Sequence, residues 1–159
     1  MLSKSSSSQI RAPIIALDLG EKRVGVALCD ALAISIKPIA AIGRTSWKQL
    51  LAEVRILVQR FDAQTMVIGL PLSLDGAERD AAAGARSTAK KFAQSLDIPV
   101  YLQDERLSSV AARENLAADR VAGSDLAARL DSESAAVILK DFLVEGQDRH
   151  LVEATSRDT

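Results

Sequence analysis

The sequence predicts an α/β domain built on a mixed five-stranded sheet flanked by helices. Two observations carry this prediction. Three extended segments follow one another at short spacing between residues 14 and 42, which is typical of an antiparallel meander. Beyond residue 45, short apolar segments alternate with segments of helical periodicity. The later strands should therefore lie parallel to the first, with helices on both faces of the sheet.

The first two strands are predicted to form a hairpin. An apolar run starts at Ile14, breaks at Gly20, passes a charged tip at residues 21–23 and resumes over residues 24–28. Residues 34–42 give the third extended run.

Helices and strands then alternate. Residues 46–60 carry apolar side chains at intervals of three and four, and Ser46 or Thr45 can cap the helix that this pattern predicts. Residues 65–71 form a short apolar run ended by glycine and proline, as expected of a central strand covered on both faces. A second helix follows and leads into a short strand at residues 98–102.

Two helices are predicted after the last strand. One begins near Ser108, a loop covers residues 119–130, and the final helix runs from 131 to 144. Asp131 then lies in the first turn of this helix, in line with its apolar stripe of Ala135, Ile138, Leu139 and Phe142. Its carboxylate should point toward the sheet.

Composition fixes the broad class of protein. The 159 residues are 48% hydrophobic with a net charge of −1, which fits a single folded domain. We expect this domain at residues 13–145. Residues 1–12 are serine-rich and expected to be disordered, and residues 146–159 form a polar tail. No apolar run approaches the roughly 20 residues of a membrane helix, and the N-terminus lacks the apolar stretch of a secretory signal. We expect a cytoplasmic protein without a membrane partner.

Single copies of cysteine and histidine limit the chemistry. Cys29 lies in an apolar strand, where it is expected to be a packing residue, and His150 lies in the polar tail. Catalysis must then depend on carboxylates, lysines, arginines, hydroxyls or a bound metal. The near-zero net charge argues against a protein that coats nucleic acid unspecifically, although a local basic face is compatible with it.

Three carboxylates at element edges are the candidate site. Asp18 interrupts an apolar strand, Glu105 follows the last strand, and Asp131 faces the sheet. Because carboxylates packed together repel one another, a shared pocket requires a cation, and hard oxygen ligands suit Mg²⁺ or Mn²⁺. Each acid also has a structural interpretation: a strand end reaching solvent for Asp18, a surface charge for Glu105, and a helix cap for Asp131.

Four cations could contact substrate phosphates around these acids. They are Lys22 and Arg23 at the hairpin tip, Arg86 on the outer face of the second helix, and Arg106 beside Glu105. The alternative for the hairpin tip is an ordinary solvated turn.

The sequence also resembles a known family. Four segments match the blocks of the YqgF/RuvX family: residues 18–27 (DLGEKRVGVA), 68–72 (IGLPL) with Asp75 and Gly76, 104–108 (DERLS) and 131–139 (DSESAAVIL). The resemblance implies an RNase H-like fold and makes Asp18, Glu105 and Asp131 an acidic catalytic triad. It further implies a metal-dependent nuclease that matures the 5′ end of pre-16S ribosomal RNA, with structured RNA as its partner.

Other functions share parts of this pattern. A Holliday junction resolvase acting on branched DNA would use the same site. Sugar kinases and actin-like ATPases carry a similar glycine-rich hairpin, matched by Asp18, Gly20 and Gly25, but they close two domains around the nucleotide and this chain has one. A non-catalytic binding module is disfavoured, because an acid cluster without a metal would only destabilise the fold.

Overall fold

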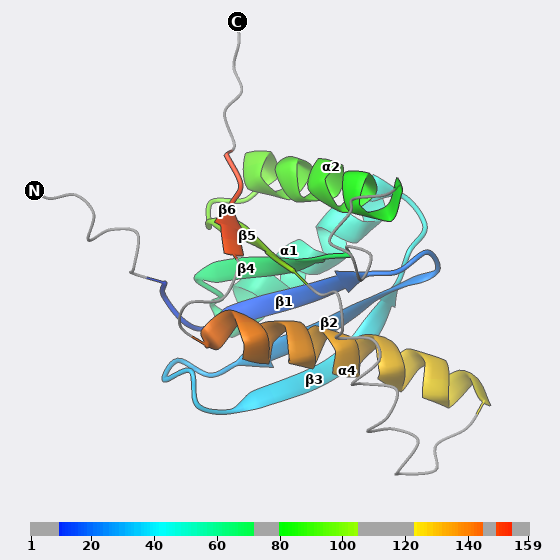
Figure 1. Ribbon diagram of the computed structural model, residues 1–159, viewed down its shortest axis with the longest axis horizontal. Helices are drawn as coiled ribbons and strands as arrows, with labels where there is room; N and C mark the ends of the chain where they lie inside the picture. Colours follow the sequence, from blue (N-terminus) through cyan, green and yellow to red (C-terminus); the bar gives the residue numbers. More distant parts are fainter. Residues whose placement is uncertain (1–9, 72–79, 105–122, 145–148, 154–159) are drawn as a thin grey trace, which may run out of the picture.

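The computed structural model describes residues 10–71, 80–104, 123–144 and 149–153. Within these ranges the chain forms one mixed sheet with helices on both faces (Figure 1). The strands are β1 (Ile14–Leu19), β2 (Arg23–Cys29), β3 (Ile36–Gly43), β4 (Thr65–Leu70), β5 (Val100–Asp104) and β6 (Arg149–Leu151). The helices are α1 (Trp47–Phe61), α2 (Asp80–Ser95) and α4 (Gly123–Leu143). None of these helices combines the length and apolarity needed to cross a membrane.

The strand order is β3-β2-β1-β4-β5-β6. The predicted meander is confirmed by the antiparallel pairs β1–β2 and β2–β3, and β4 and β5 run parallel to β1 as expected. The predicted count of five strands is wrong, because residues expected in the polar tail form β6, antiparallel to β5. Three residues are too few to show an alternating pattern. Backbone hydrogen bonds to β5 hold the segment instead, and they continue at Val152, whose N–H donates to the Val100 carbonyl at 2.8 Å.

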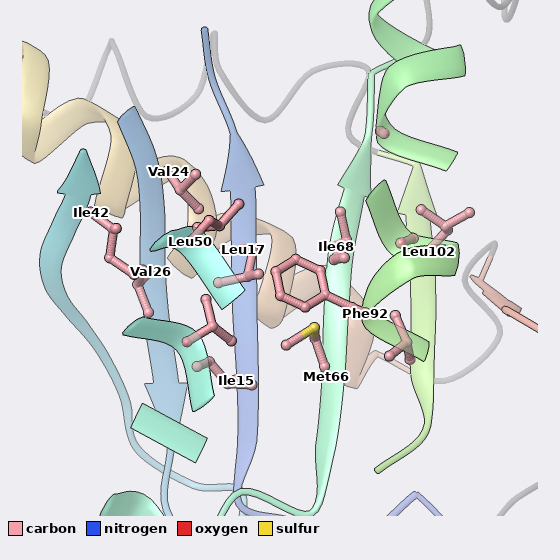
Figure 2. Close-up of a cluster of buried hydrophobic side chains, with 14 of the residues drawn as sticks. Ile15, Leu17, Val24, Val26, Ile42, Leu50, Met66, Ile68, Phe92 and Leu102 are labelled. Carbon is pink, nitrogen blue, oxygen red and sulfur yellow. The ribbon is translucent and has the colours of Figure 1, made fainter. Parts of the chain in front are cut away.

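α1 and α2 cover one face of the sheet. Large apolar side chains from the strands meet Leu50 of α1 and Phe92 of α2 in the main core (Figure 2). The predicted cap of α1 is confirmed, since the Ser46 hydroxyl accepts a hydrogen bond from the backbone N–H of Gln49 at 3.1 Å.

Of the three described helices, α4 is the one that covers the opposite face. Its predicted stripe is confirmed: Ala135, Ile138, Leu139 and Phe142 are fully buried against the strands. The helix begins at Gly123, however, so the loop predicted for residues 119–130 is wrong from residue 123 onward. Residues 126–130 are leucine, alanine and arginine, which are strong helix formers and favour this longer helix. The helix predicted near Ser108 lies outside the described residues.

Candidate active site

One row of residues crosses the α4 face of the sheet near the carboxyl ends of its parallel strands. Asp18 of β1 pairs with Gly25 of β2, and Gly69 of β4 pairs with Gln103 of β5. The parallel pairing of β1 with β4 puts Asp18 beside Gly69. The row therefore reads Gly25, Asp18, Gly69, Gln103 from β2 to β5, with one acidic side chain between two glycines.

Alternation along the strands shows that this row faces α4. The row two residues away on each strand, further from the carboxyl ends of the parallel strands, packs in the α4 core: Ala27, Ala16, Val67 and Tyr101. Residues two apart on a strand share a face. Asp18 thus continues the α4 face of β1 at the point where the apolar cover ends, and its side chain is half-buried.

Gly25 lets α4 come unusually close to the sheet. A Cβ atom at this position would lie 1.8 Å from the backbone oxygen of Asp131 and 2.9 Å from the nitrogen of Ser132. No side chain fits there without moving backbone. Because Asp18 is the cross-strand partner of Gly25, the same approach brings Asp131 next to Asp18, although the two residues are 113 positions apart in the sequence.

Two polar contacts fasten this part of α4. The Arg23 Nε donates to Asp131 Oδ2 at 2.8 Å, and the Ser132 hydroxyl donates to the Ile39 carbonyl at 2.5 Å. The ion pair is partly exposed, with the Arg23 side chain 36% and the Asp131 side chain 26% accessible. Such pairs contribute about 0–1 kcal/mol to stability. Its main effect is to orient the Asp131 carboxylate.

The bulge in β3 belongs to the same region. Opposite Gly25, the pairing of β2 with β3 shifts, so that Ala40 and Ala41 together face one residue of β2. Beside the bulge lies a cavity of about 530 Å³, lined by Arg23, Ser132, Glu133 and residues 38–41 of β3. The cavity therefore reaches Arg23, the ion-pair partner of Asp131, from the β3 side of the sheet.

The helix-cap interpretation of Asp131 is wrong. Asp131 lies in the third turn of α4 and not in the first, so it cannot cap the N-terminal amides. Its carboxylate binds Arg23 instead.

The structure describes two of the three residues predicted to form an acidic triad. The Asp131 backbone lies over Gly25, the cross-strand partner of Asp18, whereas Glu105 and the neighbouring Arg106 lie outside the described residues. In the described part of the chain, no three Asp, Glu, His or Cys side chains form a group that could hold a metal ion. The two carboxylates are hard oxygen donors on neighbouring elements, which fits Mg²⁺ or Mn²⁺ with further ligands from elsewhere.

The predicted phosphate contacts lie on different parts of the surface. Lys22 is exposed at the hairpin tip, and its backbone carbonyl accepts a hydrogen bond from Arg44 at 2.9 Å. Arg86 is exposed on α2, across the sheet from α4. A cavity of about 300 Å³ separates the hairpin tip from α2 and is lined in part by Gly20, Arg44 and Gly84. A ligand touching both Lys22 and Arg86 would have to pass over the carboxyl edge of the sheet.

Cys29 is confirmed as a packing residue. It is buried in the α4 core, and its Sγ accepts a hydrogen bond from the Ile14 backbone N–H at 3.4 Å. Burial raises the pKa of the thiol above its ordinary value, and the nearby Asp30 charge acts in the same direction. A protonated, buried thiol is not a nucleophile.

Comparison with known proteins identifies the family of this chain. A family model described as "RuvX: Holliday junction resolvase" matches residues 12–145. The chain belongs to the RuvX family. A protein of Anaeromyxobacter sp. (strain Fw109-5) named "Putative pre-16S rRNA nuclease" is 36% identical over 129 residues, which cover 81% of this chain and 94% of that one. The Myxococcus xanthus (strain DK1622) protein of the same name is 39% identical over 127 residues, 80% of this chain and 84% of its own.

The fold of this RuvX family member has solved counterparts. T. thermophilus RuvC in complex with a Holliday junction substrate superposes with a TM-score of 0.52 and 14% identity, over 81% of this chain and 91% of that chain. At this identity the likeness shows the fold alone. The fold agrees with the RNase H-like class expected from the sequence.

Sequence reasoning missed three features of the site. It assigned Gly25 only to a glycine-rich hairpin, Arg23 only to phosphates, and Gln103 to no role. The packing of Gly25 and the pairing of Arg23 depend on α4, more than 100 residues away. Gln103 left a visible signal, because it is a polar residue at an inward position of a strand, two residues after Tyr101.

Proposed function

We propose that this RuvX protein is a divalent-metal-dependent nuclease that processes the 5′ end of pre-16S ribosomal RNA. The observation that carries the proposal is the approach of Asp131 to Asp18 through Gly25, at the carboxyl edge of the parallel strands. Ligands of open α/β sheets bind at this edge. Asp18 and Asp131 both lie near this edge, and neither caps a helix.

Asp18, Glu105 and Asp131 are proposed to hold Mg²⁺ or Mn²⁺. A divalent cation at this site would activate a water for attack on phosphorus and stabilise the charge on the leaving oxygen. The chain itself supplies the positioning. β1 and α4 fix the two described carboxylates, and Arg23 keeps Asp131 turned toward the sheet.

Lys22, Arg23, Arg86 and Arg106 are proposed to bind phosphates of the RNA. Arg23 uses Nε for Asp131, which leaves its terminal nitrogens for a phosphate. The cavity lined by Arg23, Ser132 and Glu133 gives a polynucleotide strand access to the same place. Phosphate contacts of this kind position a substrate without reading its sequence.

The choice of RNA rests on the sequence relatives. Proteins 35–39% identical to this chain carry the pre-16S rRNA nuclease name, whereas the likeness to RuvC is one of fold. Junction cleavage is therefore the less favoured alternative, although it would use the same acids.

A cleavage assay tests the proposal directly. Purified protein is incubated with Mn²⁺ or Mg²⁺ and either a precursor 16S RNA or a four-way DNA junction, with Asp18→Asn as the matched inactive variant. We expect the RNA to be cut to a 5′-phosphate product and Asp18→Asn to lose activity by orders of magnitude, because removing a ligand removes the cation's contribution. Cleavage of the junction alone would overturn the RNA assignment, and equal cleavage by Asp18→Asn would overturn the site.

A further inference from the structure

A small cationic cavity lies between the start of α1 and the second half of α2. It measures about 100 Å³ and is lined by residues 44–47, Leu50, Thr88 and Lys91. Arg44 and Lys91 supply two positive charges, three lining residues carry hydroxyl groups, and no described residue that lines the cavity is acidic. Pockets that enclose a whole small ligand measure about 300–1,000 Å³, so this cavity has room for one phosphate group and not for a nucleotide.

Both cations are held in place without being neutralised. Arg44 is half-buried; its Nη1 donates to the Gly20 carbonyl at 2.8 Å, and its backbone N–H donates to the Lys22 carbonyl at 2.9 Å. The Lys91 Nζ lies 5.4 Å from the centroid of the Trp47 ring. In the described part of the chain, neither cation pairs with a carboxylate. A guanidinium and an ammonium fixed in this way keep donors for an anion.

The neighbouring cavity shows why an anion is favoured on the Lys91 side of Arg44. Arg44 also lines the 300 Å³ cavity beside the hairpin tip, together with Glu21 and Asp80. Two carboxylates there outweigh one guanidinium, so that cavity repels an anion. Lys91 adds its charge to the smaller cavity only.

Arg44 links the small cavity to the carboxyl edge of the sheet. Gly20, whose carbonyl holds the Arg44 side chain, lies two residues after Asp18, just beyond the end of β1. Asp18 continues the α4 face of β1, whereas the cavity is lined by α1 and α2 on the opposite face. Every nucleotide of an RNA strand carries a phosphate. A strand that crosses this edge at the acids can therefore place another of its phosphates in the cavity.

We propose that the cavity between Arg44 and Lys91 binds one backbone phosphate of the RNA, at a distance from the bond that is cut. This inference rests on the RNA substrate of the proposed function, but the contact itself needs no divalent cation. It adds Arg44 and Lys91 to the residues that position the substrate, on the face of the sheet opposite α4. Because the contact is made to a phosphate, it fixes the path of the strand and reads no base.

The test measures binding of a labelled precursor 16S RNA in chelator, where no metal-dependent cleavage occurs, over a series of salt concentrations. Lys91→Gln should bind more weakly at low salt and reduce the slope of log K against log salt by about 0.7–0.9, the value for one phosphate contact. Lys91→Arg keeps the charge and should keep the wild-type slope. Arg44→Gln should also weaken binding. The double variant should lose less affinity than the two single losses combined, because both cations contact the same phosphate.

Lys90→Gln is the matched control. Lys90 is exposed and adjacent to Lys91 on α2 but does not line the cavity, so this change alters the net charge equally and leaves the cavity intact. It should keep the wild-type slope. Melting curves without RNA check that each variant is folded at the temperature of the assay.

Three results would overturn the phosphate contact and leave the nuclease function standing. One is an equal salt slope for the wild type and Lys91→Gln. Another is an equal loss in Lys90→Gln and Lys91→Gln, because the effect would then be one of net charge. The third is a rise in melting temperature with inorganic phosphate that Lys91→Gln loses while its RNA binding stays unchanged, which would reassign the cavity to a free anion.

The remaining outcomes separate this contact from the proposed function. If Arg44→Gln does not fold, Lys91→Glu decides: it should weaken binding further than Lys91→Gln, and no further weakening would refute the contact. Failure of the wild type to bind the RNA would overturn the RNA substrate and the contact together. Binding with the expected slopes but no cleavage when Mn²⁺ is supplied would overturn the nuclease function and support the contact.

Discussion

The two faces of one sheet are built from different side chains and serve different ends. Toward α1 and α2 the strands present large aliphatic residues, and these meet Phe92 and Leu50 in the main core (Figure 2). Toward α4, β1 and β2 present small ones near the site, with Ala16, Ala27 and finally Gly25 beneath the helix, while Ile14 and Val67 lie on the same face farther away. Large side chains hold helices away from a sheet, and small ones let backbone approach backbone.

The difference explains why the acids lie on the α4 face. A helix held about 10 Å above the sheet by packed side chains leaves no room for short carboxylates from both layers to meet. At Gly25 the separation falls until the Asp131 backbone lies against β2, beside the strand position of Asp18. Both faces bury an apolar core, but only the α4 face has a position, Gly25, at which helix backbone meets strand backbone.

The largest effect on stability is expected from the α1/α2 face. Phe92 is fully buried and packs edge-on against Trp47 with ring centroids 4.8 Å apart, so Phe92→Ala should cost about 3–5 kcal/mol in urea unfolding. The fraction that remains folded should still respond to Mn²⁺, because the site is on the other face. Lys90→Ala, an exposed change on the same helix, is the control. A folded Phe92→Ala protein that no longer responds to Mn²⁺ would mean that the faces are coupled.

A methyl group at Gly25 should cost less stability than Phe92→Ala but remove the response to Mn²⁺. Gly25→Ala must push α4 away from β2, which we expect to cost about 1–3 kcal/mol and to abolish the Mn²⁺-induced stabilisation. Adding Asp131→Glu, whose side chain is one methylene longer, should restore part of the Mn²⁺ response without restoring stability. The control is Gly43→Ala, where a Cβ meets no atom within 4 Å. A full Mn²⁺ response in Gly25→Ala would show that close approach is not what makes the site.

The smallest expected effect lies at the far end of α4. Burial raises the pKa of Asp141, the neighbouring Lys140 lowers it, and the Asp104 charge raises it again. An acid with a raised folded-state pKa destabilises the protein once pH exceeds its unfolded value of about 3.9. Asp141→Asn should therefore stabilise the protein at pH 7 by less than about 1 kcal/mol. It should make no difference at pH 2.5, where Asp141 is protonated in both states. Thermal unfolding at the two pH values checks this, and equal gains at both would refute the electrostatic cause.

Local signals in the sequence determined most of the fold. Hydrophobic alternation and three-to-four spacing depend on residues only a few positions apart, so the hairpin, α1, β4 and the buried stripe of α4 were predictable. A carboxylate in an apolar strand marked Asp18 for the same reason. The start of α4 and the short β6 escaped prediction, because neither carries an apolar pattern of its own.

Tertiary structure alone decided how the site is assembled. The row from Gly25 to Gln103 is set by strand register, the place of Asp131 by the depth at which α4 packs, and its orientation by Arg23. Each of these relations joins residues from different elements, and for Asp131 the separation exceeds 100 residues. A single sequence shows which side chains could meet. The backbone hydrogen bonds between strands and the contact between helix and sheet select the ones that do, because they fix distances that no local pattern encodes.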